Sequence, residues 1–131
     1  LPASAFELET VLHGHLAAAN RWAGLILVLT DDEPPAEPYR TRARRILGAA
    51  GALGLPAAAI LGEGAAAEVP LEETPAGRIV LSHTGRVPGI AGSLLAGAMA
   101  LQLLTERLAR ARGMNPDTLG REDAAQAAAH A

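Results

Sequence analysis

The chain has 131 residues and a formal charge of −3 at pH 7, which suits a single domain with a modest core. Apolar residues make up 50% of it, yet Phe6, Trp22 and Tyr39 are the only aromatic ones, so Ala, Leu, Val and Ile must build the core. Nucleic-acid binding is not expected, because it uses a basic face and stacking rings. The sequence lacks Cys, which excludes disulfides and thiolate chemistry and, with no leader-like N-terminus, predicts a cytoplasmic protein.

The first half of the chain predicts a helix, a strand and a second helix. The first helix covers Ser4–Ala19, is interrupted near Gly14, and carries an apolar stripe at helical spacing. The continuous apolar run Leu25–Thr30 predicts a strand that is buried on both faces. After an acidic, proline-rich loop, the pattern of Glu37–Leu53 predicts a helix, and Gly54 is expected to end it.

The second half repeats this alternation. Strands are predicted at Ala57–Leu61 and Arg78–Ser82, separated by the loop Gly62–Gly77. The longest helix is predicted over Ile90–Arg112, with Gly113 just beyond its end. Its predicted buried stripe consists of Leu94, Ala98, Leu101, Leu104 and Leu108. No apolar run reaches the roughly 18–20 residues that span a bilayer, so we expect no membrane association.

Strands that alternate with helices predict an α/β fold of three layers, a short parallel sheet flanked by helices. We expect one domain over residues 1–114 and a tail with a short helix over residues 115–131. Ligands of open parallel sheets bind beyond the carboxyl ends of the strands. Those ends lead into Asp31–Glu33, Gly62–Gly64 and Ser82–Gly85, and none of these segments has the spacing of a phosphate-binding loop.

Two histidines, His13 and His15, flank Gly14 in the first helix. Residues two apart on a helix point in divergent directions and no third ligand has suitable spacing, so we predict no metal site. Glu9 lies one turn before His13 and shares its face. Each of these residues also has a purely structural reading, as a helix-junction imidazole or a solvated carboxylate. His83, at the end of the third strand, is either a ligand-loop residue or an ordinary loop residue.

Three blocks of the sequence together resemble a known family. They are Glu9–Ala17 with the strand that follows it, Ala52–Pro56 before the second strand, and Leu101–Asp117, which ends in Arg-Gly-Met-Asn-Pro-Asp. These blocks resemble the C-terminal sugar isomerase (SIS) domain of the isomerase half of glucosamine-6-phosphate synthase and related phosphosugar isomerases and deglycases. The resemblance implies a partial SIS domain of flavodoxin- or Rossmann-like fold. It also implies a phosphorylated sugar or amino sugar as partner, a homodimeric parent protein and no cofactor.

The resemblance assigns roles to individual residues. The family's ring-opening histidine matches His13, a role that suits an imidazole near neutral pH. We therefore expect His13 to be catalytic and Glu9, His15 and His83 to contact substrate; His15 replaces a proline of the family.

Two catalytic groups of the family lack a counterpart here. The position of its general base, a Glu, precedes Leu1, and its Schiff-base Lys falls near Ala124 in a chain without Lys. Isomerisation, deamination or deglycation is thus expected of the parent rather than amination, and this chain alone is expected to be inactive. The alternative is a non-catalytic sugar-phosphate-binding regulatory or dimerisation module.

Overall fold

The computed structural model describes residues 4, 7–16, 18–19, 22–30, 37, 39–82, 89–115 and 128. Four of these, namely Glu9, Leu12, His13 and Ile90, are described by their backbone only. The chain forms two compact units, Leu1–Gly97 and Ala98–Ala131, and the long helix α4 passes through the boundary between them. Each unit is described by itself.

Three parallel strands form the sheet of the first unit, in the order β1-β2-β3. They are β1 (Leu25–Leu29), β2 (Ala57–Gly62) and β3 (Arg78–Leu81). Leu27 pairs with Ala59 in the first ladder, and Ile60 pairs with Ile79 in the second. All three predicted strands are confirmed to within one residue at their ends.

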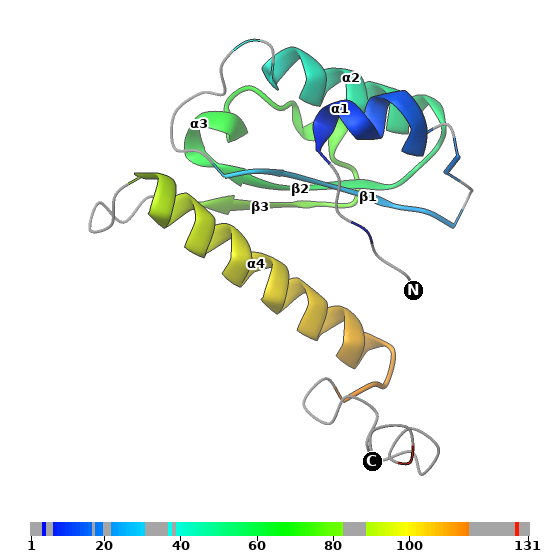
Figure 1. Ribbon diagram of the computed structural model, residues 1–131, viewed down its shortest axis with the longest axis vertical. Coiled ribbons are helices and arrows are strands. Elements are labelled where there is room, and N and C mark those ends of the chain that lie inside the picture. Colours follow the sequence, from blue (N-terminus) through cyan, green and yellow to red (C-terminus); the bar gives the residue numbers. More distant parts are fainter. Residues whose placement is uncertain are drawn as a thin grey trace. The chain divides into compact units, whose positions relative to one another are not determined.

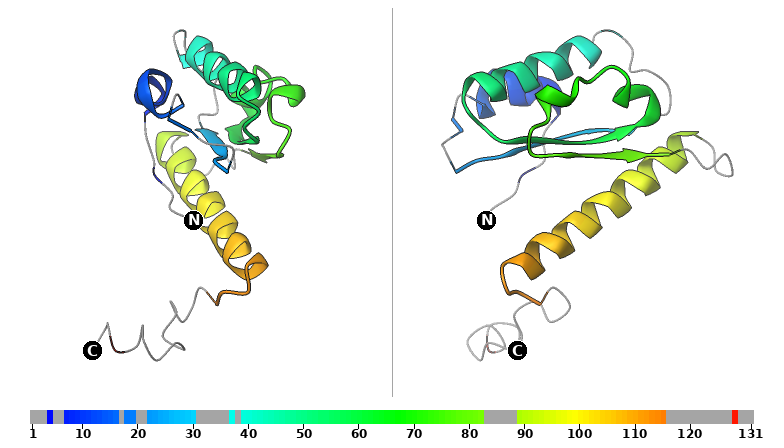
Figure 2. Two further views of the ribbon diagram at one scale, coloured as in Figure 1. Left: turned by 90° about the vertical axis from the view of Figure 1, so that its right-hand side faces the viewer. Right: turned by 180° about the vertical axis from the view of Figure 1, so that it is seen from behind.

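Helical segments connect these strands, precede the first one or follow the last one (Figure 1 and Figure 2). They are α1 (Leu8–Thr10), the π-helical turn η1 (Val11–His15), α2 (Tyr39–Ala52), α3 (Glu63–Ala66), the 3₁₀ turn η2 (Leu71–Glu73) and α4 (Gly89–Ala111). Because parallel neighbours need a crossover, α2 joins β1 to β2, and the segment with α3 and η2 joins β2 to β3. The predicted α/β fold, a short parallel sheet flanked by helices in three layers, is confirmed.

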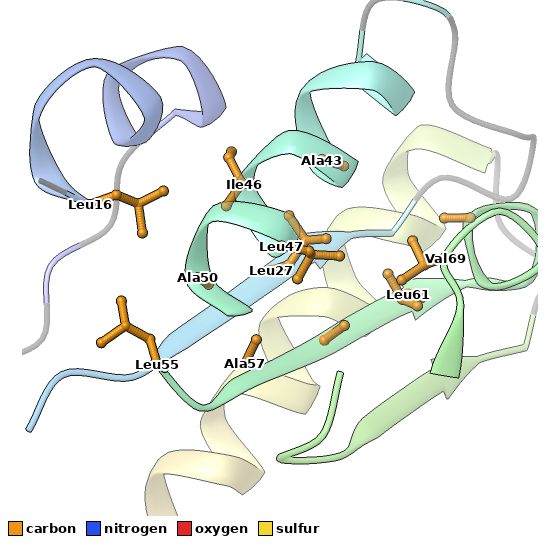
Figure 3. Packing of buried hydrophobic residues seen from close by; sticks show 12 residues of the cluster. Leu16, Leu27, Ala43, Ile46, Leu47, Ala50, Leu55, Ala57, Leu61 and Val69 are labelled. Carbon is orange, nitrogen blue, oxygen red and sulfur yellow. The ribbon is translucent and has the colours of Figure 1, made fainter. Parts of the chain in front are cut away.

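The core lies on one face of the sheet, under α1, η1 and α2 (Figure 3). On this face β1 contributes Leu27, while α2 contributes the large and almost fully buried side chains Ile46 and Leu47. The strand β2 contributes mostly alanine and therefore lets α2 approach the sheet closely. The whole cluster comprises Leu16, Leu27, Ala43, Ile46, Leu47, Ala50, Leu55, Ala57, Ala59, Leu61, Ala65 and Val69.

The opposite face of the sheet is apolar but only partly covered. Ile26 and Val28 of β1 alternate with the core residue Leu27 and are exposed, as is Ile79 of β3. The prediction that β1 is buried on both faces is therefore wrong. A continuous apolar run indicates that both faces of a strand are suited to burial. A face is buried only if another element also covers it.

The loop predicted over Gly62–Gly77 contains two short helical segments, α3 and η2. Gly62 ends β2 and directly precedes α3, so the strand passes into a helical turn without a loop. The sequence pattern missed both segments because each is no more than a single turn, too short for an apolar stripe to repeat.

The buried stripe of α4 is shifted by one position along the helix from the predicted stripe. Ser93, Gly97 and Ala100 are buried, whereas Leu94, Ala98 and Leu101 are exposed. Gly97 lies against Thr30 so closely that an added Cβ would be 2.9 Å from the threonine methyl group. Small side chains thus occupy the buried positions because the backbone itself approaches its neighbour, and the leucines remain on the outside.

Glycines with positive φ end both long helices, as predicted. Gly54 (φ 68°) follows α2, and the next amide, that of Leu55, donates to the Ala50 carbonyl at 2.9 Å. Gly113 (φ 73°) follows α4 in the same way. This is the hydrogen-bond pattern of a Schellman cap, which favours glycine because a Cβ is strained at positive φ.

Replacing Gly54 by alanine is expected to lower the free energy of unfolding by about 1–2 kcal/mol, the strain of a side chain at positive φ. The matched control is Gly51→Ala, because Gly51 lies within α2 and an added Cβ there meets no atom within 4 Å in the part of the chain that the structure describes. That substitution is expected to stabilise the protein by roughly 0.5–1 kcal/mol through helix propensity. Urea unfolding followed by circular dichroism measures both, and effects of the same sign would contradict the assigned cap.

Candidate functional site

The segment that carries the two N-terminal histidines is helical and changes its winding at these residues. After the single α-helical turn α1, the chain follows a π-helical turn over Val11–His15. The Leu16 amide donates to the Val11 carbonyl at 3.2 Å, a hydrogen bond between residues five apart. The helix predicted over Ser4–Ala19 is thus shorter in the structure, Leu8–His15, and the change of winding that includes Gly14 corresponds to the predicted interruption. Isolated π turns are rare and often occur at functional sites.

The core holds this turn in place. Leu16, directly after η1, is buried in the core cluster, and Leu8 and Val11 pack against it. Gly14 and His15 are exposed, and a Cβ added at Gly14 would meet no atom of the described residues within 4 Å. Contacts with the described residues therefore do not require glycine at this position. A glycine here leaves the backbone of the turn accessible, which permits a ligand to approach closely.

The predicted site residues are only partly within the described structure. The backbones of Glu9 and His13 lie in α1 and η1, four residues apart, and their side chains are outside the description. His15 is the exposed last residue of η1. His83 and the acidic loop Asp31–Glu33 lie outside the described residues. The structure thus places Glu9, His13 and His15 on one short helical segment.

An arginine-centred network lies beside β3 and was not predicted from the sequence. The half-buried Arg78 guanidinium donates to the carbonyls of Val69 (3.0 Å) and Pro70 (2.7 Å) and to the Thr74 hydroxyl (2.9 Å from Nη2). The Thr74 hydroxyl also donates to the Leu71 carbonyl at 3.2 Å. One side chain therefore ties the crossover that contains η2 to the first residue of β3. The sequence feature that could have indicated this network is an arginine at the first position of an otherwise apolar strand.

A second unanticipated feature is an open pocket of about 320 Å³. Thr41, Arg44 and Arg45 of α2 and Glu73 of η2 line it. By themselves, arginines on a helix such as α2 indicate a solvated face. Arg44 and Arg45 are exposed, and the crossover brings Glu73, from a distant part of the chain, to the same pocket.

Two further features bear on the type of site. Among the described residues, no group of three or more His, Asp or Glu side chains is arranged to hold a metal ion. None of the described helices combines the length and apolar character needed to cross a bilayer. Comparison of the chain with protein-family models, with curated proteins and with solved structures found no match.

Proposed function

We propose that this chain is the C-terminal part of a phosphosugar isomerase-like protein and binds a phosphorylated sugar or amino sugar at its His-Gly-His segment. The observation that carries this proposal is the π-helical turn over Val11–His15, which contains both histidines and an exposed glycine. His13 is the proposed acid/base group, with Glu9 and His15 as substrate contacts. His83 is proposed as a further contact.

The order of the secondary-structure elements supports the proposal. A helical segment with the His-Gly pair precedes the first strand of a parallel sheet, and a long helix follows the last strand. That helix ends at the Arg-Gly step of the terminal block, where Gly113 has a positive φ and the Met114 amide donates to the Ala109 carbonyl at 3.0 Å. These are the elements on which the resemblance to SIS domains depends.

The proposed chemistry consists of two proton transfers on a sugar phosphate. Ring opening moves a proton from the anomeric hydroxyl to the ring oxygen as the bond between the anomeric carbon and that oxygen breaks, and isomerisation moves a proton between C1 and C2. An imidazole can accept and return a proton near neutral pH, as opening of a sugar ring requires. Amination through a Schiff base would need a lysine, and the chain contains none. We therefore propose aldose–ketose isomerisation, deamination or deglycation for the parent protein.

Titration with glucosamine-6-phosphate or fructose-6-phosphate, followed by NMR of the histidine ring protons, tests this proposal. We expect a saturable shift of the His13 signals that inorganic phosphate does not reproduce, and no turnover by this chain alone. Changing His13 to Gln should remove the response of the π turn's amide signals, whereas His15→Gln should weaken it. Equal shifts with inorganic phosphate, or none with either sugar, would contradict the proposal.

The alternative function is a non-catalytic sugar-phosphate-sensing or dimerisation module, and α4 favours it. Leu94, Leu101 and Leu108 are spaced by seven residues, which places them along one side of the helix. They are 72%, 39% and 52% exposed. Contiguous exposed apolar surface of this kind is typical of interaction sites. We propose that, in such a module, a second copy of this chain packs against this side of α4.

A further inference from the structure

We infer that Gly14 is a positioning residue of the His-Gly-His segment. As the extra residue of the π turn η1, it keeps His15 exposed while Leu16 returns to the core. The identity of the ligand rests on the proposed function. The register of the turn, meaning which of its residues meet the core, does not, because it follows from the burial of the residues themselves.

An uninterrupted α-helix in this segment would turn a histidine toward the core. Leu8 and Val11 pack against the core cluster, and α-helical spacing continues their stripe to positions 15 and 16. In that register the imidazole of His15 would lie against apolar side chains, where its nitrogen atoms would need hydrogen-bond partners. Regular α-helical winding is therefore unfavourable for this sequence at His15.

The π turn avoids this burial by holding one more residue than an α-helical turn. The Leu16 amide donates to the carbonyl of Val11, five residues earlier, whereas an α-helix joins residues four apart. Leu16 is 8% exposed and belongs to the core cluster, whereas Gly14 and His15 are exposed. The wider turn thus carries the chain past His15 before it returns to the core.

Gly14 is the residue of this turn that the fold needs least. It has no side chain, and an added Cβ would meet no atom of the described residues within 4 Å. Its φ is not positive, unlike that of Gly54 or Gly113, so its backbone conformation does not require glycine. Glycine is also a poor helix former. A residue that weakens the helix and fills no space in the packing points to a role in binding.

Deletion of Gly14 tests the inference. It places Leu16 four residues after Val11, the α-helical spacing, so Leu16 still reaches the core. We expect a urea midpoint at least as high as that of the unmodified chain, because regular α-helical winding returns and a poor helix former is lost. We expect binding of glucosamine-6-phosphate, followed by NMR of the segment's amides, to weaken by about tenfold or more, because His13 and His15 become neighbours and change their relative direction.

The matched control is Gly14→Ala, which keeps the number of residues and therefore the register, and should bind the sugar phosphate more tightly than the deletion variant does. A lower urea midpoint in the deletion variant than in the unmodified chain would overturn the inference, as would unchanged binding in the deletion variant or equal losses of binding in both variants. No saturable binding by the unmodified chain contradicts the proposed function instead, and the urea midpoints then still decide whether the extra residue serves the fold.

Discussion

Replacing Leu47 by alanine is expected to lower the free energy of unfolding by about 2–5 kcal/mol, the range for a leucine truncated in a packed core. Leu47 is 2% exposed and lies on the face of α2 that packs on the sheet. Domains of this kind are stable by only about 5–15 kcal/mol, so the loss is a large share of the total. Urea denaturation monitored by circular dichroism measures it.

Leu53 supplies the matched control, because it directly follows the same helix and is 54% exposed. Helical spacing from Ile46 and Ala50 would place Leu53 on the buried face, but the structure shows it exposed. Leu53→Ala is expected to change stability by less than about 1 kcal/mol. Ile46→Val, at about 0.5–1.5 kcal/mol, provides a milder core variant if Leu47→Ala does not fold. Equal losses at Leu47 and Leu53 would show that the core is assigned to the wrong residues.

The second large effect concerns self-association through α4. Changing Leu94 and Leu101 together to glutamine is expected to raise the dimer dissociation constant by about tenfold or more, because a buried leucine contributes roughly 1.5–3 kcal/mol. Glutamine is a good helix former, so α4 itself should persist. Sedimentation velocity over a range of protein concentrations measures the association, and circular dichroism checks the helix.

A control pair of leucines on α4 distinguishes a specific interface from non-specific hydrophobic association. Leu95 and Leu103 are 58% and 60% exposed, and Leu103 lies about two and a half turns from Leu94, on the opposite side of the helix. Leu95→Gln/Leu103→Gln also replaces two exposed leucine side chains by glutamine and should leave the dimer intact. A monomer at every concentration, or an equal effect of both pairs, would refute the proposed dimer.

Much of the candidate site could be anticipated from local sequence, and one part of it could not. The His-Gly-His stretch was predicted within an interrupted helix, and the structure shows a π turn there. The pocket joins Arg44 and Arg45 to Glu73, which follows them in the chain only after β2 and α3. Because its two walls come from separate elements, no local pattern could show that Glu73 lines the same pocket as the arginines.

The same distinction applies to burial. A helical period identifies α4, and a glycine followed by Pro or polar residues marks where each long helix ends. Whether Leu94 or Ser93 faces inward depends on how closely a neighbouring backbone approaches, as Gly97 and Thr30 illustrate. Because α4 has apolar residues on two sides, its sequence alone does not show which side is buried against a neighbouring element.

Local sequence predicts the three strands, the two long helices and their glycine caps, because these follow from interactions between residues a few positions apart. The fold sets which face of the sheet is covered, which side of α4 is buried, and that Glu73 lines the same pocket as Arg44 and Arg45. These features depend on contacts between segments that are distant in the chain, and their geometry arises only when the crossovers bring those segments together.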